Sequence, residues 1–163
     1  PVAAVFGKLL PYTLILSLQG ALFLWFMYGQ LGWPMNGSWA IILLSQWLMV
    51  LASQGVALLL FLLARNSVRA LSLAAAYTAP SFAFMGVTFP VSDMNPAALI
   101  WRDLLPVSHY IEIQLLQANH GASLQAVAPQ IGALLLFSLS YLLAFKLIKR
   151  IQQPPATSAA KAS

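Results

Sequence analysis

Long apolar runs, separated by short polar or charged segments, dominate the pattern of the chain. They occupy residues 9–28, 39–64, 70–91 and roughly 128–148. A helix rises about 1.5 Å per residue, so about 20 apolar residues cross a hydrocarbon core of about 30 Å. The runs are long and lack the alternation of a barrel wall, which favours helices over strands. The pattern predicts an all-α, polytopic membrane protein with about four transmembrane helices in residues 1–151.

The segment between the third and fourth runs is different, because prolines and charges interrupt its apolar residues. Asn95 followed by Pro96 suits a helix start, since Asn caps and Pro occupies the first turn without losing a hydrogen bond. Pro106 ends this helix and begins a second one, which Gly121 closes. We therefore expect two short helices within residues 96–119. They form an outer hairpin that is re-entrant or lies in the membrane interface.

Small residues recur at helical spacing and predict close packing between the runs. Ala75, Ala79 and Ala83 repeat every four residues, a pattern that lets helices approach closely. Pro80 lies among them and predicts a kink. A second small and weakly polar stripe in the first run consists of Thr13, Ser17, Gly20 and Ala21.

Three polar side chains in the second run have two interpretations. Gln46 and Ser53 are seven residues apart and share a helix face, with Gln54 next to them. Buried amides in lipid are costly unless they are paired. These residues either bond one helix to another or line a substrate path.

Composition supports a lipid environment and removes several classes of function. The 163 residues are 61% hydrophobic and 7% charged, whereas a soluble domain carries about 25% charged residues. The net charge of +5 does not indicate a nucleic-acid partner, because the basic residues lie at the ends of apolar runs. There are no cysteines, which excludes thiol chemistry and cysteine-ligated zinc.

The charges also predict an orientation. With four spans, one side of the membrane holds the basic residues Lys8, Arg65, Arg69, Lys146, Lys149, Arg150 and Lys161. The other side holds Arg102 together with the acids Asp93, Asp103 and Glu112. By the positive-inside rule, both termini and the turn at 65–69 are cytoplasmic. Residues 152–163, rich in Pro, Ala and Ser, are expected to be a disordered cytoplasmic tail.

Candidate chemistry is sparse. His109 and Glu112 are three residues apart on one helix face and could bind a metal, with His120 as a third ligand. The interpretation that we favour is a wetted interfacial face, so no metal, cofactor or catalytic residue is expected. Arg102 and Asp103 are expected to pair with each other or with neighbouring groups. No G-x-x-x-x-G-K-[ST] motif is present, so ATP binding of that kind is excluded.

Several short motifs, in this order, resemble the ABC-2 family of ABC-transporter permeases. That family often shows a Gly, a Phe-Pro and a Met-Pro after its fifth span, then a Pro followed closely by Tyr. The matching residues are Gly86, Phe89-Pro90, Met94-Asn95-Pro96 and Pro106 to Tyr110, with Asn95 as a one-residue departure. The opening residues 7–12 (GKLLPY) also look like the start of that family's third span. The likeness extends to about Arg150.

The resemblance implies a permease subunit, here its C-terminal portion with the third to sixth of six spans. It would work with a separate ATPase and a second permease subunit, as a homo- or heterodimer in the cell (inner) membrane, and would export cargo. The turn carrying Arg65, Asn66 and Arg69 would face the ATPase. The outer gate would include Pro96, Pro106, Tyr110 and Glu112. The alternative is a non-transport membrane protein, either structural or an intramembrane enzyme using Asp93, His109 and Glu112.

Overall fold

The computed structural model describes residues 2–152, and every regular element in that range is helical. The predicted disordered tail therefore lies, apart from its first residue, outside the described residues. In chain order the elements are α1 (Val2–Leu24), the π-helix η1 (Trp25–Gln30), α2 (Trp39–Ala64), α3 (Ser67–Thr78), α4 (Ser81–Phe84), the 3-10 helix η2 (Val91–Asp93), α5 (Pro96–Asp103), α6 (Pro106–His120), α7 (Leu124–Ser138) and α8 (Ser140–Gln152).

Three helical stretches among the described residues are long and apolar enough to cross a membrane. They are Ala3–Gln30, Trp39–Ala64 and Leu124–Ile151, and each contains one of the predicted runs. The first combines α1 with η1, and the third combines α7 with α8 across Leu139. The chain is thus a helical membrane protein, as the apolar pattern predicts.

The run at 70–91 does not form one continuous helix, so this part of the prediction is wrong. The helix α3 ends at Thr78, and Pro80 caps the four-residue α4. Pro80 has no N–H to donate and its ring obstructs the preceding turn, which is the kink that the sequence predicts. After α4 the backbone is irregular, with Gly86 at φ +91° in a region that glycine tolerates.

The two short helices begin at the predicted positions. Asn95 caps α5 by accepting a 2.8 Å hydrogen bond from the Ala98 backbone N–H, and Pro96 occupies the first turn. Pro106 begins α6, and Gly121 ends it in the left-handed conformation at φ +57°. The capping chemistry read from the sequence is therefore confirmed. Placement of this hairpin at the outer membrane surface remains a prediction.

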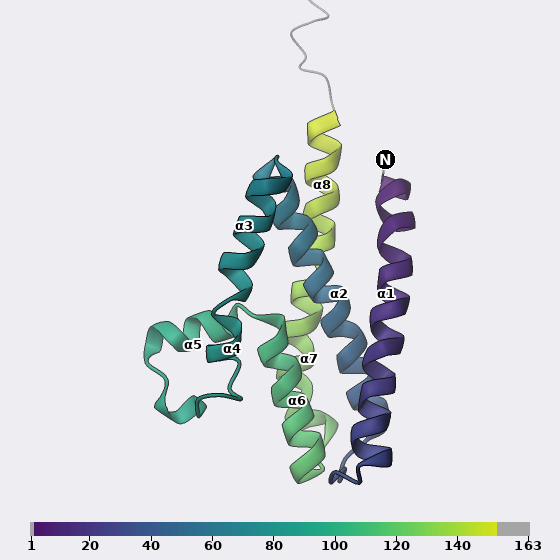
Figure 1. The fold of residues 1–163 in the computed structure, drawn as a ribbon, viewed down its shortest axis with the longest axis vertical. Coiled ribbons are helices and arrows are strands. Elements are labelled where there is room, and N and C mark those ends of the chain that lie inside the picture. Colours follow the sequence, from purple (N-terminus) through teal and green to yellow (C-terminus); the bar gives the residue numbers. More distant parts are fainter. Residues whose placement is uncertain (1, 153–163) are drawn as a thin grey trace, which may run out of the picture.

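The helix α2 is the centre of the fold, because α1, α3, α6, α7 and α8 all pack against it (Figure 1). Its buried residues Leu48 and Ala52 form a core cluster with residues of α6 and α7. The helix α1 packs closely on α2 at one residue of its small-residue stripe: Gly20 lies so close to Gln46 that a side chain there would clash. By contrast, Ala75 of α3 and Ala79, which follows this helix, are exposed within the described chain, and the buried residue of α3 is Ala70.

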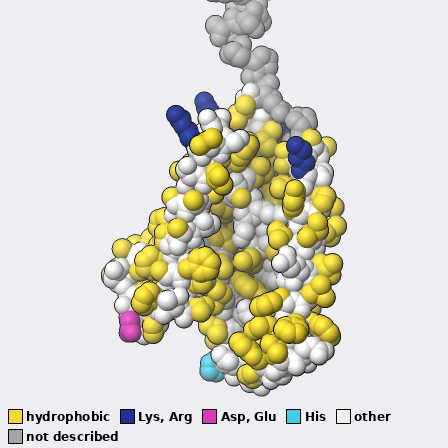
Figure 2. Space-filling view, viewed as in Figure 1, with side chains coloured by type: hydrophobic (Ala, Val, Ile, Leu, Met, Phe, Trp, Pro, Cys, Tyr) yellow, Lys and Arg dark blue, Asp and Glu magenta, His cyan; other side chains and the backbone are white. Residues whose placement is uncertain are grey.

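The described chain ends and the α2–α3 turn lie together at one end of the molecule (Figure 1). Figure 2 shows Lys and Arg side chains gathered at this end, while acidic and His side chains appear towards the opposite end. Between them the visible surface is largely hydrophobic. This is the charge distribution expected of a chain whose basic end and opposite end lie on different sides of a bilayer.

Candidate functional site

The polar residues of α2 meet a groove of about 640 Å³ between α1, α2 and α6. Gln46, Ser53 and Gln54 all line it, so the structure brings the three predicted path residues together. Tyr110 and Gln114 contribute the α6 wall. The remaining lining consists of Leu16, Gln19, Gly20, Phe23, Leu24, Met49, Val50 and Ala57.

Two of these amides also bond one helix to another. The Oε1 atom of Gln54 accepts hydrogen bonds from Thr13 Oγ1 at 2.7 Å and from Tyr141 OH at 3.0 Å. Gln46 is buried and its Nε2 donates to the Leu16 backbone oxygen at 3.4 Å. We call Thr13, Gln54 and Tyr141 the mid-helix cluster. It joins α1, α2 and α8 without any charged group, which meets the pairing that an amide in lipid requires.

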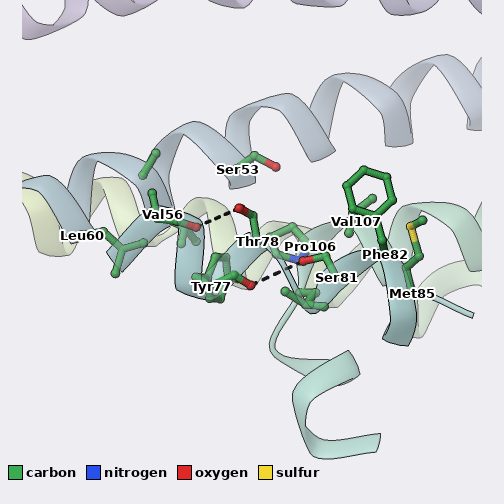
Figure 3. Close-up of a pocket in the computed structure, with 13 residues that line it drawn as sticks. Ser53, Val56, Leu60, Tyr77, Thr78, Ser81, Phe82, Met85, Pro106 and Val107 are labelled. Carbon is green, nitrogen blue, oxygen red and sulfur yellow. Dashed lines mark hydrogen bonds between the residues drawn. The ribbon is translucent and has the colours of Figure 1, made fainter. Parts of the chain in front are cut away.

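A second, more enclosed pocket of about 290 Å³ is also lined by Ser53 (Figure 3). Ala74, Tyr77 and Thr78 of α3 contribute one wall, and Phe82 of α4 another. The hydroxyls of Thr78 and Ser81 are bonded back to the backbone of their own segment, at Ala74 O and Tyr77 O. These hydroxyls are therefore partly satisfied, and the pocket surface is mainly apolar. Ser53 and Ala57 line both cavities, so the two hollows adjoin along one face of α2.

A charged network joins the hairpin of α5 and α6 to α7. Arg102 Nη2 of α5 lies 2.6 Å from Glu112 Oε2 of α6, and the other oxygen of Glu112 accepts from Gln130 Nε2 of α7 at 2.7 Å. Gln130 Oε1 lies 2.9 Å from His109 Nδ1, and His109 Nε2 lies 3.0 Å from the Asp103 backbone oxygen. We call Arg102, His109, Glu112 and Gln130 the hairpin cluster.

The interpretation of His109 and Glu112 as one wetted face is wrong for His109, which is only 8% exposed. Packing of α6 against α7 covers the ring, and Phe137 lies 5.9 Å from it. Arg102 pairs more closely with Glu112 than with Asp103, whose carboxylate is 3.7 Å away and largely exposed. The sequence reading missed Gln130, although an amide inside an apolar run is itself a signal of a paired or functional group.

The remaining predicted gate residues hold different positions in the hairpin. Pro96 is exposed and Pro106 is buried. The bend between α5 and α6 is held by Tyr77, whose hydroxyl donates to the Leu104 backbone oxygen at 2.5 Å. Burial, with a smaller contribution from the neighbouring Tyr28, raises the pKa of Tyr110 to about 12. Tyr110 is therefore neutral at ordinary pH and can act only through shape and hydrogen bonding.

The C-terminal end of α6 is fastened to the loop between η1 and α2, a contact that the sequence did not reveal. Gln117 is fully buried; its Oε1 accepts from the Ser38 backbone N–H at 2.8 Å, and its Nε2 donates to Ala122 O at 2.7 Å. Asn36 donates from its backbone to Ala118 O and from its side chain to Asn119 O. These contacts, which we call the α6 anchor, fix one end of the hairpin.

Comparison with known families adds a direct result. The family model described as ABC-2 family transporter protein matches residues 1–146. This chain belongs to the ABC-2 transporter family. Searches of curated proteins and of solved structures give no significant match. The membership identifies a transmembrane transport component and agrees with the motif order in the hairpin region.

In this ABC-2 family protein the basic turn is compact and exposed. Arg65 is the one described residue other than glycine with a positive φ, at +53°, which closes α2. Asn66 caps α3 by accepting a 2.9 Å hydrogen bond from the Val68 backbone N–H. Arg65 and Arg69 are exposed. A left-handed residue followed by an Asn cap reverses the chain within two residues and presents both guanidinium groups to solvent.

The ABC-2 chain has no cluster of three or more His, Asp or Glu suited to a metal within residues 2–152. His120 lies exposed at the far end of α6. His109 and Glu112 are each engaged in the hairpin cluster. Asp93, named in the enzyme alternative, accepts a hydrogen bond from Ser92 and does not join this cluster.

Proposed function

We propose that this chain is a transmembrane permease subunit of an ATP-driven exporter that works with a separate ATPase and a second permease subunit. The family match over residues 1–146 carries the proposal. The chain lacks a phosphate-binding loop of the G-x-x-x-x-G-K-[ST] type, which is why the energy source is assigned to a partner.

We place the protein in the cell (inner) membrane. In the proposed orientation its basic end lies in the cytoplasm. Charge segregation between the two ends of the molecule supports this orientation (Figure 2). The exposed turn at Arg65, Asn66 and Arg69 then meets the ATPase, and α5 and α6 lie at the outer surface. Binding at this turn would let nucleotide-driven motion act directly on α2 and α3, two of the helices that line the enclosed pocket.

The proposed cargo path runs along the face of α2 that carries Ser53. Two adjoining hollows of about 640 Å³ and 290 Å³ meet there. Their walls are mainly apolar with a few amides and hydroxyls, so an apolar or amphipathic cargo suits them. Gln46 and Gln54 have a second role as helix-to-helix contacts. Movement of the hairpin, which forms one wall of each hollow, would open or close the path.

Co-purification with a candidate ABC ATPase subunit tests the partnership. We expect a stable complex that hydrolyses ATP on the partner subunit, because the chain lacks a G-x-x-x-x-G-K-[ST] loop. The double variant Arg65→Glu with Arg69→Glu should lose the ATPase. Lys149→Glu is the matched control, since it reverses an exposed charge on α8 at the same end of the molecule.

Loss of the complex in the turn variant, with retention in the Lys149 control, would support the assigned contact. Equal retention in both variants would contradict that contact. ATP hydrolysis by the purified chain alone, free of any partner, would overturn the permease assignment itself.

A further inference from the structure

The hairpin cluster connects two oxygen acceptors through two side chains. At one end is the Asp103 backbone oxygen, which faces His109 Nε2 at 3.0 Å. At the other end is Glu112 Oε1, which faces the Gln130 amide at 2.7 Å. Between them, His109 Nδ1 and Gln130 Oε1 are 2.9 Å apart. These three contacts require three hydrogens if all of them are hydrogen bonds.

Neutral side chains do not supply that many. A neutral imidazole carries one N–H, and an amide in a chain donates on one side and accepts on the other. With an ionised Glu112, His109 and Gln130 therefore provide two hydrogens for three contacts. Rotating the Gln130 amide by half a turn moves the shortage to the Glu112 contact and does not remove it. One additional proton, on His109 or on Glu112, completes the chain in either arrangement.

We propose that the hairpin cluster is a binding site for one proton, held between His109 and Glu112. Arg102 lies 2.6 Å from Glu112 and favours the ionised carboxylate. The proton then lies on His109, where an imidazolium donates from both ring nitrogens, to Gln130 and to the Asp103 carbonyl. Because His109 is only 8% exposed, water is poorly placed to supply the missing hydrogen bond.

The charges around His109 agree with this assignment. The helix α5 brings Arg102 and Asp103, and α6 itself brings Glu112. The other elements that pack on α6, namely α2, α4 and α7, contain no Asp, Glu, Lys or Arg; α7 contributes Gln130 and the Phe137 ring. One guanidinium with two carboxylates carries one negative charge, and the added proton makes the group neutral. A neutral group costs less than a charged one next to hydrocarbon.

The proton site links protonation to movement of the hairpin. This step rests on the gating role proposed above. Gln130 is the α7 residue of the cluster, so moving α6 away from α7 breaks both of its contacts. Water can then solvate His109 and Glu112 separately, and the extra proton is no longer required. Opening is therefore linked to proton release, and acidic conditions hold the hairpin against α7.

Nitrogen NMR of the imidazole ring tests the proton count directly. The chain has two histidines, so a His120→Asn background leaves His109 as the only signal. In this background, reconstituted in lipid nanodiscs at neutral pH, we expect both ring nitrogens of His109 to be protonated. In His120→Asn with Glu112→Gln, the new amide supplies the third hydrogen, and at the same pH His109 should become a neutral ring with its proton on Nε2.

A second variant, Gln130→Leu, removes the connecting amide and keeps the Arg102–Glu112 pair, and it too should lose the doubly protonated ring. Infrared spectroscopy of the carboxyl region covers the other position of the proton. A protonated-carboxyl band that disappears in Glu112→Gln, together with a neutral His109, would support the one-proton site with the proton on Glu112.

A neutral His109 in the His120→Asn background, with no protonated-carboxyl band, would overturn the proton site. A doubly protonated ring together with transport that does not respond to pH would overturn the link to opening alone. Neither NMR nor infrared result depends on the ATPase, so failure of the proton site is distinguishable from failure of the permease assignment.

Discussion

The mid-helix cluster and the hairpin cluster both join three helices, yet they use different chemistry. Thr13, Gln54 and Tyr141 connect α1, α2 and α8 with neutral hydrogen bonds only. The hairpin cluster connects α5, α6 and α7 with an ion pair and a ring that can carry charge. The first lies within long apolar helices, where a charge is expensive. The second lies where α5, α6 and α7 meet, and its Glu112 side chain is 33% exposed.

The difference indicates which contacts are permanent and which can change. A neutral hydrogen bond inside a spanning helix has no alternative partner if it breaks, because lipid offers none. A charged contact near the surface exchanges its partner for water at moderate cost. The α1 attachment is therefore expected to be constant during transport, while the attachment of the hairpin to α7 is expected to vary.

Replacing Arg102 with Met should give the largest loss of stability. The Arg102 side chain is 11% exposed, and its removal leaves the partly buried Glu112 carboxylate without its guanidinium partner. We expect the free energy of unfolding to fall by about 2 kcal/mol, in the range of a hydrogen bond to a charged group. Denaturation in mild detergent measures the change. Asp93→Asn is the control, because Asp93 is exposed and bonded to Ser92; equal losses in both variants would contradict the role of the ion pair.

Replacing Gln54 with Leu should have a smaller effect. The variant loses two hydrogen bonds between helices, which in membranes average about 0.6 kcal/mol each, so we expect a loss of about 1 kcal/mol. Cross-linking of cysteines introduced in α1 and α8 would show whether the helices separate. Ser53→Ala, the exposed neighbour in the same helix, should leave stability unchanged. A larger loss of stability in Gln54→Leu than in Arg102→Met would contradict the expected order of the two clusters.

Salt concentration should change the stability contributed by the hairpin cluster and leave that of the mid-helix cluster unchanged. Raising the salt concentration from about 0.01 M to about 1 M shortens the Debye length from about 30 Å to about 3 Å. Over this range the free energy of unfolding of the parent protein should fall by less than about 1 kcal/mol, because the Arg102–Glu112 pair is only partly exposed. Gln54→Leu should show the same salt dependence as the parent, and Arg102→Met should show less. If Arg102→Met keeps the salt dependence of the parent, the salt dependence does not come from the Arg102–Glu112 pair.

The smallest effect at ordinary pH should come from Tyr110→Phe. Burial raises the pKa of Tyr110 from 10.0 to about 12, so folding favours the protonated phenol. The contribution to stability is complete below pH 10 and is lost as the pH rises towards 12. The parent should therefore lose more stability than Tyr110→Phe between pH 10 and pH 12, with equal transport near neutrality. A difference between them that appears below pH 9 would contradict this assignment.

Helix ends could be predicted from the local sequence, whereas tertiary contacts could not. Asn95, Pro96, Pro106 and Gly121 act through backbone groups next to them, so their effect is readable from adjacent residues. The hairpin cluster joins residues up to 28 positions apart, from Arg102 to Gln130, through packing of α6 on α7. Burial of His109 follows from that packing and has no local signal. The broken helix near Pro80 lies between these cases, since Pro80 predicted a kink and the structure shows an interruption.

The α6 anchor restricts the movements available to the hairpin formed by α5 and α6. Translation of α6 along its own axis would have to break the contacts of Gln117, Asn36 and Ser38 together. Rotation about the anchored end preserves them, so this end is the natural pivot. Displacement then grows with distance from the pivot and is greatest at the N-terminal turn of α6 and in α5. His109 lies in that distal part, where the arc of motion is long.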